Sequence, residues 1–147
     1  MTSQEAGLVQ SSFRLVEPIL EDAVLIFYNR LFELDPALRS MFAAARDVQA
    51  RKLAQALRVV VTAIDRPEQI KGAVEALGRR HGGYGVRDRD YATVGAALLA
   101  TLEAGLGAAF TPDVRAAWSA AYSWLAFTMQ RAAARNAAAE TTLPVAV

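Results

Sequence analysis

Apolar residues recur at helical spacing along most of this chain, and proline-containing breaks interrupt the pattern at intervals. Alanine and leucine dominate the periodic stretches, and few runs alternate as a half-buried strand would. Asp35-Pro36, Asp65-Arg66-Pro67 and Thr111-Pro112 each combine a helix-capping side chain with a proline, which suits the first turn of a helix because its missing N–H is not needed there. The chain is therefore expected to be all-α, with a new helix beginning at each break.

The breaks predict helices of unequal length joined by short corners. We expect them over about 4–17, 18–34, 35–42, 48–64, 67–81, 88–106 and from 112 into the alanine-rich tail. In the last helix Trp118, Tyr122, Leu125 and Met129 form one apolar stripe. Such uneven helices do not suit a regular four-helix bundle.

The composition indicates one compact domain. The 147 residues are 54% hydrophobic and 21% charged, which is typical of a globular chain rather than a disordered one. We expect a single domain over residues 1–147, with a tail over 136–147 that frays. The net charge is +1 and the basic residues cluster only in pairs, which argues against nucleic-acid binding.

The chain shows no sign of export or membrane insertion. Its N-terminus lacks the basic and apolar regions of a secretory signal, and no run reaches about 18 consecutive apolar residues. We therefore expect a cytoplasmic protein without a membrane span, present as a monomer or a homodimer.

His81 is the only histidine, and the chain has no cysteine. A structural zinc site needs about four nitrogen or sulfur ligands, so zinc is excluded, as are disulfides and covalently attached c-type haem. A di-iron bundle needs a glutamate three residues before the histidine, where this chain has Gly78. A haem iron, however, needs only one protein imidazole. Considered alone, His81 is at least as well explained as a packed or solvated side chain, so its surroundings decide.

A series of short motifs occurs in the order found in bacterial haemoglobins. They are Phe27-Tyr28 with Leu31-Phe32, Asp35-Pro36, Phe42, Gln49 with Lys52-Leu53, His81, Tyr91 to Gly95, Phe110-Thr111, Ala117-Trp118 and Ala121-Tyr122. On these residues the chain resembles single-domain bacterial haemoglobins, which are related to the globin domains of flavohaemoglobins and to bacterial neuroglobin-like proteins. The resemblance implies a globin fold of about seven to eight helices around a haem pocket, with haem b as the cofactor.

The resemblance also implies roles for residues on both sides of the haem. His81 would be the proximal iron ligand, with its other ring nitrogen donating to a carbonyl one turn back, that of Leu77. Tyr28 would donate to dioxygen, Gln49 would add an amide donor, and Leu53 would form the apolar wall over the iron. Since there is no second histidine, two histidines of one chain cannot both bind the iron. A buried core tyrosine and an exposed helix-start glutamine are the alternatives for the two polar positions.

Further cofactor contacts follow from the same resemblance. Phe42, Leu77, Val86, Tyr91 and Val94 would contact the haem, and Lys52 and Arg80 would pair with its propionates. For the apolar residues an ordinary core position explains burial nearly as well, and exposed basic residues are usually only solvated.

One position departs from the flavohaemoglobin pattern. Those proteins carry a glutamate late in the last helix, paired with the tyrosine at the position of Tyr91, but the matching residue here is Ala133. A carboxylate partner makes the proximal imidazole more electron-rich and favours O–O cleavage. Its absence favours reversible gas binding over peroxidase-like chemistry.

The sequence therefore predicts a haem-b globin that binds dioxygen reversibly at a five-coordinate iron, with nitric oxide and carbon monoxide as further ligands. Its role would be oxygen binding or transport, or nitric oxide detoxification by dioxygenation. The chain has no G-x-G-x-x-G fingerprint and no room for a flavin domain, so a separate flavin reductase would supply electrons. A gas sensor that acts through a partner protein and a haem-free helical interaction domain are the alternatives.

Overall fold

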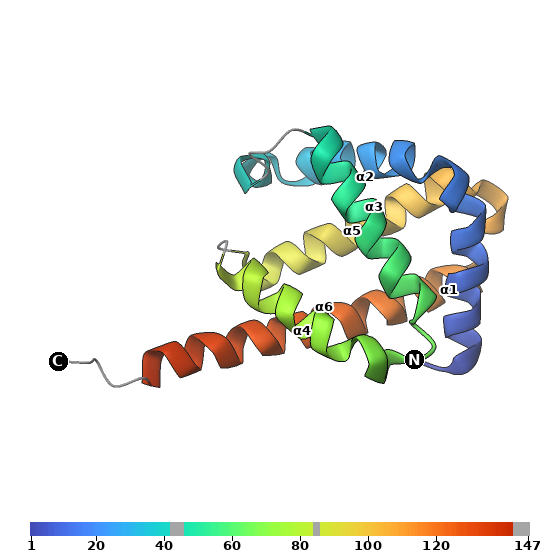
Figure 1. Ribbon diagram of the computed structural model, residues 1–147. Helices are drawn as coiled ribbons and strands as arrows, with labels where there is room; N and C mark the ends of the chain where they lie inside the picture. The colour runs from blue at the N-terminus through green and yellow to red at the C-terminus, as the bar shows by residue number, and fades with distance from the viewer. Residues whose placement is uncertain (42–45, 84–85, 143–147) are drawn as a thin grey trace.

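A computed structural model describes residues 1–41, 46–83 and 86–142 of the chain, and the side chains within 1–40, 48–82 and 86–136. These residues form six α-helices and three short 3-10 helices, and no strand occurs among them (Figure 1). The α-helices are α1 (Ser3–Val16), α2 (Leu20–Leu34), α3 (Arg46–Thr62), α4 (Pro67–Gly83), α5 (Asp88–Leu106) and α6 (Pro112–Thr142). The 3-10 helices are η1 (Glu17–Ile19), η2 (Pro36–Met41) and η3 (Gly107–Ala109).

Helices begin at the three predicted breaks. Asp35 Oδ1 accepts a hydrogen bond from the Ala37 backbone N–H at 3.1 Å, where η2 starts. The Thr111 hydroxyl oxygen accepts from the Val114 backbone N–H at 3.2 Å, where α6 starts. In each case a side-chain oxygen satisfies an N–H that has no partner within the helix, which explains why the helix starts there.

The all-α prediction is confirmed, but the expected count of seven or eight helices is wrong for the described residues, which form six α-helices. The segment that begins at Pro36 is a 3-10 helix, which is typical of a short connector. Pro18 lies in η1, which joins α1 to α2. The last helix continues to Thr142, and the fraying expected over 136–147 remains a prediction.

The helices pack in crossing pairs. α4 lies against α6, α2 against α5, and α1 against α6 (Figure 1). The larger of two buried apolar clusters joins α1, α2, α3, α5 and α6, and the Trp118 ring in it donates from Nε1 to the buried Ser12 hydroxyl at 2.8 Å. The smaller cluster contains Ile70, Val74 and Met129 and holds α4 to α6. The tertiary contacts therefore fix α4 on α6, the helix that also supports the rest of the core.

Glycines allow α4 to lie very close to α6. A side-chain carbon at Gly78 would collide with the backbone of Met129, and one at Gly82 would lie 3.1 Å from the Cβ of Ala133. Because helix separation depends on the side chains at the contact, these two positions let the axes approach more closely than larger residues would allow. The close approach fixes the position of His81, which lies between the two glycines in the sequence.

One segment, Asp88–Ala109, is long and apolar enough to cross a membrane by length and composition alone. It comprises α5 and η3, and α5 contributes Val94, Leu98 and Leu102 to the internal cavity described below. A core-facing side accounts for this apolarity. The expected absence of a membrane span remains a prediction.

Candidate functional site

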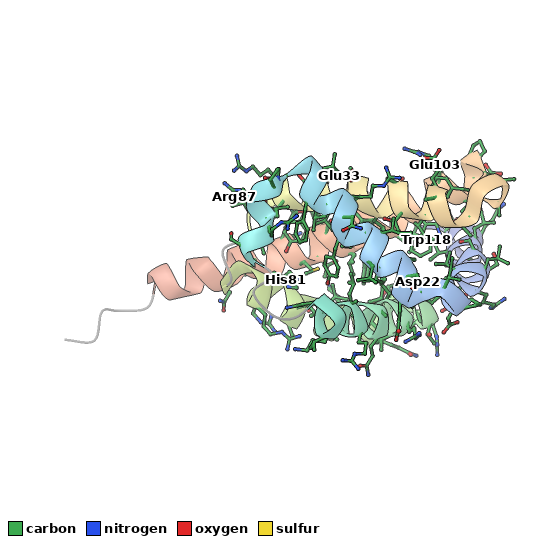
Figure 2. The ribbon with its side chains drawn as sticks, turned by 90° about the horizontal axis from the view of Figure 1, so that it is seen from above. Asp22, Glu33, His81, Arg87, Glu103 and Trp118 are labelled. Atoms are coloured by element: carbon green, nitrogen blue, oxygen red, sulfur yellow. The ribbon has the colours of Figure 1, made fainter. Side chains whose placement is uncertain are left out.

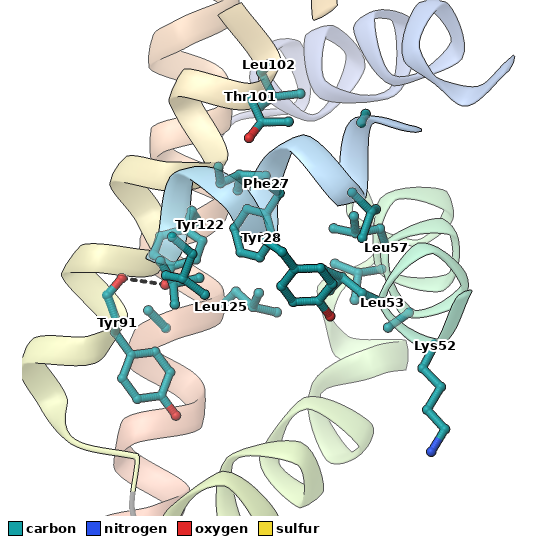
Figure 3. A pocket seen from close by; sticks show the side chains of 18 of the residues that line it. Phe27, Tyr28, Lys52, Leu53, Leu57, Tyr91, Thr101, Leu102, Tyr122 and Leu125 are labelled. Atoms are coloured by element: carbon teal, nitrogen blue, oxygen red, sulfur yellow. Dashed lines mark hydrogen bonds between the residues drawn. The ribbon is translucent and has the colours of Figure 1, made fainter. Parts of the chain in front are cut away.

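A cavity of about 390 Å³ lies among the helices, with walls from α1 to α6 (Figure 3). It brings together most of the residues that the sequence singled out: Tyr28, Gln49, Lys52, Leu53, Leu77, His81, Val86, Tyr91 and Val94. The apolar stripe of α6 borders the same cavity. Apolar walls with a few polar groups are typical of a cofactor or small-molecule site.

His81 lies near the end of α4 (Figure 2) and is partly buried. It is one of the residues that border the cavity. Its Nδ1 is 2.7 Å from the carbonyl oxygen of Leu77, one turn earlier. A carbonyl can only accept a hydrogen bond, so Nδ1 carries a proton and, in the neutral ring, the lone pair is on Nε2. The ring is thus held in the tautomer in which an imidazole binds a metal through Nε2.

Another wall of the cavity comes from α2 and α3. Tyr28 is 4% exposed, and its ring lies 5.5 Å from that of Phe27 and 6.1 Å from that of Phe32, centroid to centroid. Burial raises the pKa of its hydroxyl above the ordinary value for tyrosine, so the hydroxyl keeps its proton and remains a donor. Gln49 and Leu53, one turn apart on α3, also border the cavity. A hydroxyl, an amide and an apolar side chain are therefore brought together on this side.

Some polar side chains of the wall are used by the fold itself. The Thr101 hydroxyl donates to the Ala97 carbonyl at 2.7 Å, and the Tyr122 hydroxyl donates to the Tyr91 carbonyl at 2.6 Å (Figure 3). Burial, with a smaller contribution from Tyr91, raises the pKa of Tyr122. The Thr101 and Tyr122 hydroxyl protons are consequently committed to the backbone and not to a ligand.

Two buried polar atoms at the start of α5 have no hydrogen-bond partner within the described part of the chain. They are Oδ1 of Asp90 and the hydroxyl oxygen of Tyr91. Asp90 is 2% exposed, and its other oxygen accepts from the Arg87 backbone N–H at 2.8 Å. Burial, and then the charge of Asp88, raise the pKa of Tyr91. Both residues border the cavity, so a bound group or water there can supply the missing hydrogen bonds.

The sequence did not single out Asp90 as a site residue. An acid close to a helix start ordinarily caps that helix, and Asp90 does so through its bond to Arg87. Asp90 directly precedes the motif at Tyr91 to Gly95, which was a weak sign in the sequence of a role at the site. Only the packing of α5 shows that its carboxylate is buried at the cavity.

Ala133, on α6, lies beside Gly82, which is the residue after His81 on α4. A Cβ at Gly82 would lie 3.1 Å from the Cβ of Ala133, so this position on α6 faces the end of α4. A methyl group stands there, and within the described residues the Tyr91 hydroxyl has no acid to bond.

Three residues that were expected to contact haem differ from the others in their position relative to the cavity. Phe42 lies outside the described residues. Arg80 is exposed and does not border the cavity, so its pairing with a propionate remains a prediction. Lys52 borders the cavity, but its ammonium group points away from it (Figure 3). Long basic side chains often lie this way, with the stem on apolar surface and the charge in water.

Comparison with known proteins points to one protein family. A globin family model matches residues 25–129 of the chain. The neuroglobin of Danio rerio is 27% identical over 150 aligned positions, which cover 92% of this chain and 94% of that protein. The flavohemoprotein of Rhizobium meliloti (strain 1021) is 35% identical over 103 residues, which cover 68% of this chain but 26% of that longer protein.

Two solved structures superpose closely on this chain. An engineered carbene transferase from Rhodothermus marinus, a variant of a provisionally assigned nitric oxide dioxygenase, superposes with a TM-score of 0.86 at 27% identity and covers 96% of this chain and 99% of its own. A bacterial globin from Campylobacter jejuni superposes with a TM-score of 0.80 at 23% identity and covers 91% of this chain and 97% of its own. The second likeness concerns the fold alone.

Proposed function

Because this chain belongs to the globin family, we propose that its cavity holds haem b through His81 and that the protein binds diatomic gases there reversibly. The observation that carries the proposal is the state of the His81 ring. It is the only imidazole of the chain, it borders the cavity, and its Nδ1 donates to the Leu77 carbonyl. A ring held in this way presents Nε2 as an iron ligand.

The residues around the cavity fit this cofactor. The walls are largely apolar, as a porphyrin requires, and several helices contribute residues to them. Lys52 lies at the edge of the cavity with its charge outside, and it would be able to pair with a propionate of the haem. Val86, Tyr91 and Val94 line a further part of the wall.

When bound, haem would supply an iron with one open position for a diatomic gas. The protein's own residues would decide how firmly the gas stays. Tyr28 keeps its proton because burial raises its pKa, and it can donate to a ligand that carries partial negative charge, such as dioxygen. A hydrogen bond of this kind contributes about 1.5–3 kcal/mol. Gln49 would add a second donor, and Leu53 would keep water out.

The proximal side favours reversible binding over oxidative chemistry. Ala133 stands where a carboxylate would otherwise face the end of α4, and the Tyr91 hydroxyl has no partner within the described residues. Without a carboxylate, the His81 imidazole is held by a neutral carbonyl and would donate less electron density to a bound iron than a carboxylate-paired ring would. We therefore propose oxygen binding or transport as the leading role.

Nitric oxide detoxification is a second candidate role. The similarity to the Rhodothermus marinus protein favours it, because that protein is a variant of a provisionally assigned nitric oxide dioxygenase. Turnover would need electrons. We propose a separate flavin reductase as the electron source.

The test is the visible absorption spectrum of the purified protein in the ferric state, after reduction with dithionite, and after carbon monoxide is added. We expect a sharp Soret band that shifts at each step. The variant His81→Ala should lose the band, whereas Lys71→Ala, at an exposed position of α4 outside the cavity, should keep it. A wild-type protein without a haem band, even after addition of hemin, would contradict the proposal and leave a haem-free helical domain as the better explanation.

A further inference from the structure

Asp90 is a buried carboxylate whose charge has no part in the roles discussed above. It is 2% exposed, and of the carboxylates in the described part of the chain it alone is buried. It borders the cavity from the start of α5. Burial of a charge is costly unless the surroundings stabilise it, so a charged side chain at this position needs an explanation.

One oxygen of this carboxylate is used at the start of α5. Oδ2 accepts from the Arg87 backbone N–H at 2.8 Å and lies 3.6 Å from Nε of the Arg87 side chain. Both contacts favour the charged form of the carboxyl group, as does the positive end of the helix dipole. A neutral asparagine could accept the same bond from the backbone, so the start of the helix does not by itself require a charge.

The other oxygen of Asp90 has no such neighbour. Oδ1 is buried and has no hydrogen-bond partner within the described residues. The side chain of Arg87 is 49% exposed, whereas that of Asp90 is 3% exposed. Water therefore screens the positive charge of Arg87 much more than the negative charge of Asp90, and the carboxylate gives the cavity a negative electrostatic potential.

The rest of the described cavity wall does not cancel this potential. Only two of its other residues, Lys52 and His81, can carry a positive charge. The ammonium group of Lys52 points away from the cavity (Figure 3), and an imidazole that binds a metal is neutral. The remaining walls are largely apolar, so they screen a charge weakly.

We propose that Asp90 is a specificity-determining residue, whose buried charge disfavours anionic ligands of a haem iron in the cavity and has little effect on neutral ligands. This inference rests on the proposed function, because it concerns the ligands of the bound haem. An anion such as azide is repelled by the carboxylate, whereas carbon monoxide carries no net charge. Asp90 thereby favours diatomic gases over anions that compete for the same iron.

Binding of azide to the ferric protein tests the effect of the charge. Asp90→Asn removes the charge, nearly conserves the size of the side chain and keeps an oxygen that can accept from Arg87. We expect its affinity for azide, measured by spectroscopic titration at neutral pH, to rise by about three- to tenfold, because one partly compensated charge in a protein interior has an effect of this order. The affinity of the reduced protein for carbon monoxide should equal that of the wild type.

Asp88→Asn is the matched control. Asp88 lies in the first turn of the same helix and is exposed, so water screens its charge. Its affinity for azide should equal that of the wild type. A rise as large as in Asp90→Asn would show that the overall charge of the protein sets the affinity, and it would overturn the proposal.

Arg87→Gln separates the effect of the charge from a structural role of Asp90. It removes the positive charge beside the carboxylate and keeps the backbone N–H that Asp90 accepts from. The negative charge of Asp90 is then less compensated, so the affinity for azide should fall. A rise in both Asp90→Asn and Arg87→Gln would show that a disturbed helix start opens the site to ligands, which would overturn the proposal.

The reduction potential is a second measurement, and it needs no added ligand. A buried negative charge stabilises ferric over ferrous iron, so Asp90→Asn should raise the potential and Asp88→Asn should leave it unchanged. Azide affinities and potentials in Asp90→Asn that equal those of the wild type, with intact Soret bands in both, would overturn the proposal and leave the haem assignment untouched. Absence of a haem band in the wild type would instead contradict the proposed function, so the two failures are distinguishable.

Discussion

The Tyr28 hydroxyl lies in the cavity wall formed by α2 and α3. Of the groups in that wall, its removal should change the binding of a gas most directly. Tyr28→Phe keeps the ring contacts with Phe27 and Phe32 and removes only the donor. Loss of a hydrogen bond to a partly charged ligand should raise the dioxygen dissociation rate by about ten- to hundredfold, from about 1.5–3 kcal/mol. Stopped-flow replacement of dioxygen by carbon monoxide measures this rate.

Tyr91→Phe is the control for that experiment. It removes the hydroxyl at the start of α5, which is not part of the α2–α3 wall. Dissociation that accelerates equally in both variants would show that Tyr28 has no special contact with the gas.

The raised pKa of Tyr28 predicts how this rate depends on pH. The ordinary tyrosine pKa is about 10, and burial raises it further in the folded protein. The hydroxyl therefore stays protonated at every pH below that value, and the donor is lost only as the pH rises through the raised pKa. The dioxygen dissociation rate should be constant from about pH 6 to about pH 9.5. A rate that rises within this range would contradict the assignment of Tyr28 as a neutral donor.

Individual residues differ in how far the sequence alone could place them. The contact between His81 and the Leu77 carbonyl could be predicted, because residues four apart lie on one face of a helix. The burial of Asp90 could not, because it depends on how α5 packs against elements distant in sequence. Arg80 is adjacent to His81, yet a helix turns by about 100° per residue and carries it to the exposed side.

At the scale of the helices, the close packing of α4 on α6 should be sensitive to a single methyl group. Gly78→Ala forces a Cβ against the Met129 backbone, which cannot move independently of its helix. We expect a loss of about 1–3 kcal/mol in the free energy of unfolding. Urea denaturation followed by circular dichroism measures it, and weaker haem retention should accompany it because His81 is on the same helix.

Gly72→Ala is the matched change on the same helix. Gly72 is exposed, and a Cβ there meets nothing within 4 Å. The substitution should stabilise the protein by about 0.5–1 kcal/mol, because alanine loses less backbone entropy in a helix than glycine does. If both variants change stability in the same direction and by the same amount, the helix contact is not what limits position 78.

The packing of α4 on α6 also determines which side chain of α6 faces the end of α4 that carries His81. Ala133→Glu introduces a carboxylate that faces the end of α4, near the residue after His81. A negative group there should stabilise the ferric form and lower the reduction potential of the haem. Ala134→Glu, at the exposed neighbouring position, should leave the potential nearly unchanged. Spectroelectrochemical titration of the two variants makes the comparison, and an equal shift in both would indicate a general charge effect.

Helix starts could be predicted far better than helix types. Caps and prolines act locally, so the breaks at Asp35 and Thr111 follow from neighbouring residues. Whether the segment after Asp35 becomes a 3-10 or an α-helix depends on length and on the elements that it must connect. The close contacts at Gly78 and Gly82 depend on which helix crosses which, and spacing along the chain does not contain that information.

At the scale of the whole molecule, the cavity exists because unevenly long helices cross instead of running parallel. α2, α3, α4, α5 and α6 each contribute lining residues, so no single segment forms the site. The ordered set of motifs along the chain predicted that these residues meet, whereas the shape of the cavity could be known only from the packed structure. That the chain forms a single domain over residues 1–147 remains a proposal.

Reversible binding of dioxygen by a haem that His81 holds is the main function proposed for this protein. The most direct test is to record the absorption spectrum of the reduced protein under argon, then under dioxygen, then again under argon. We expect an oxygenated spectrum that returns to the original reduced spectrum over repeated cycles. Immediate and complete conversion to the ferric spectrum on the first exposure, with no recovery under argon, would contradict it.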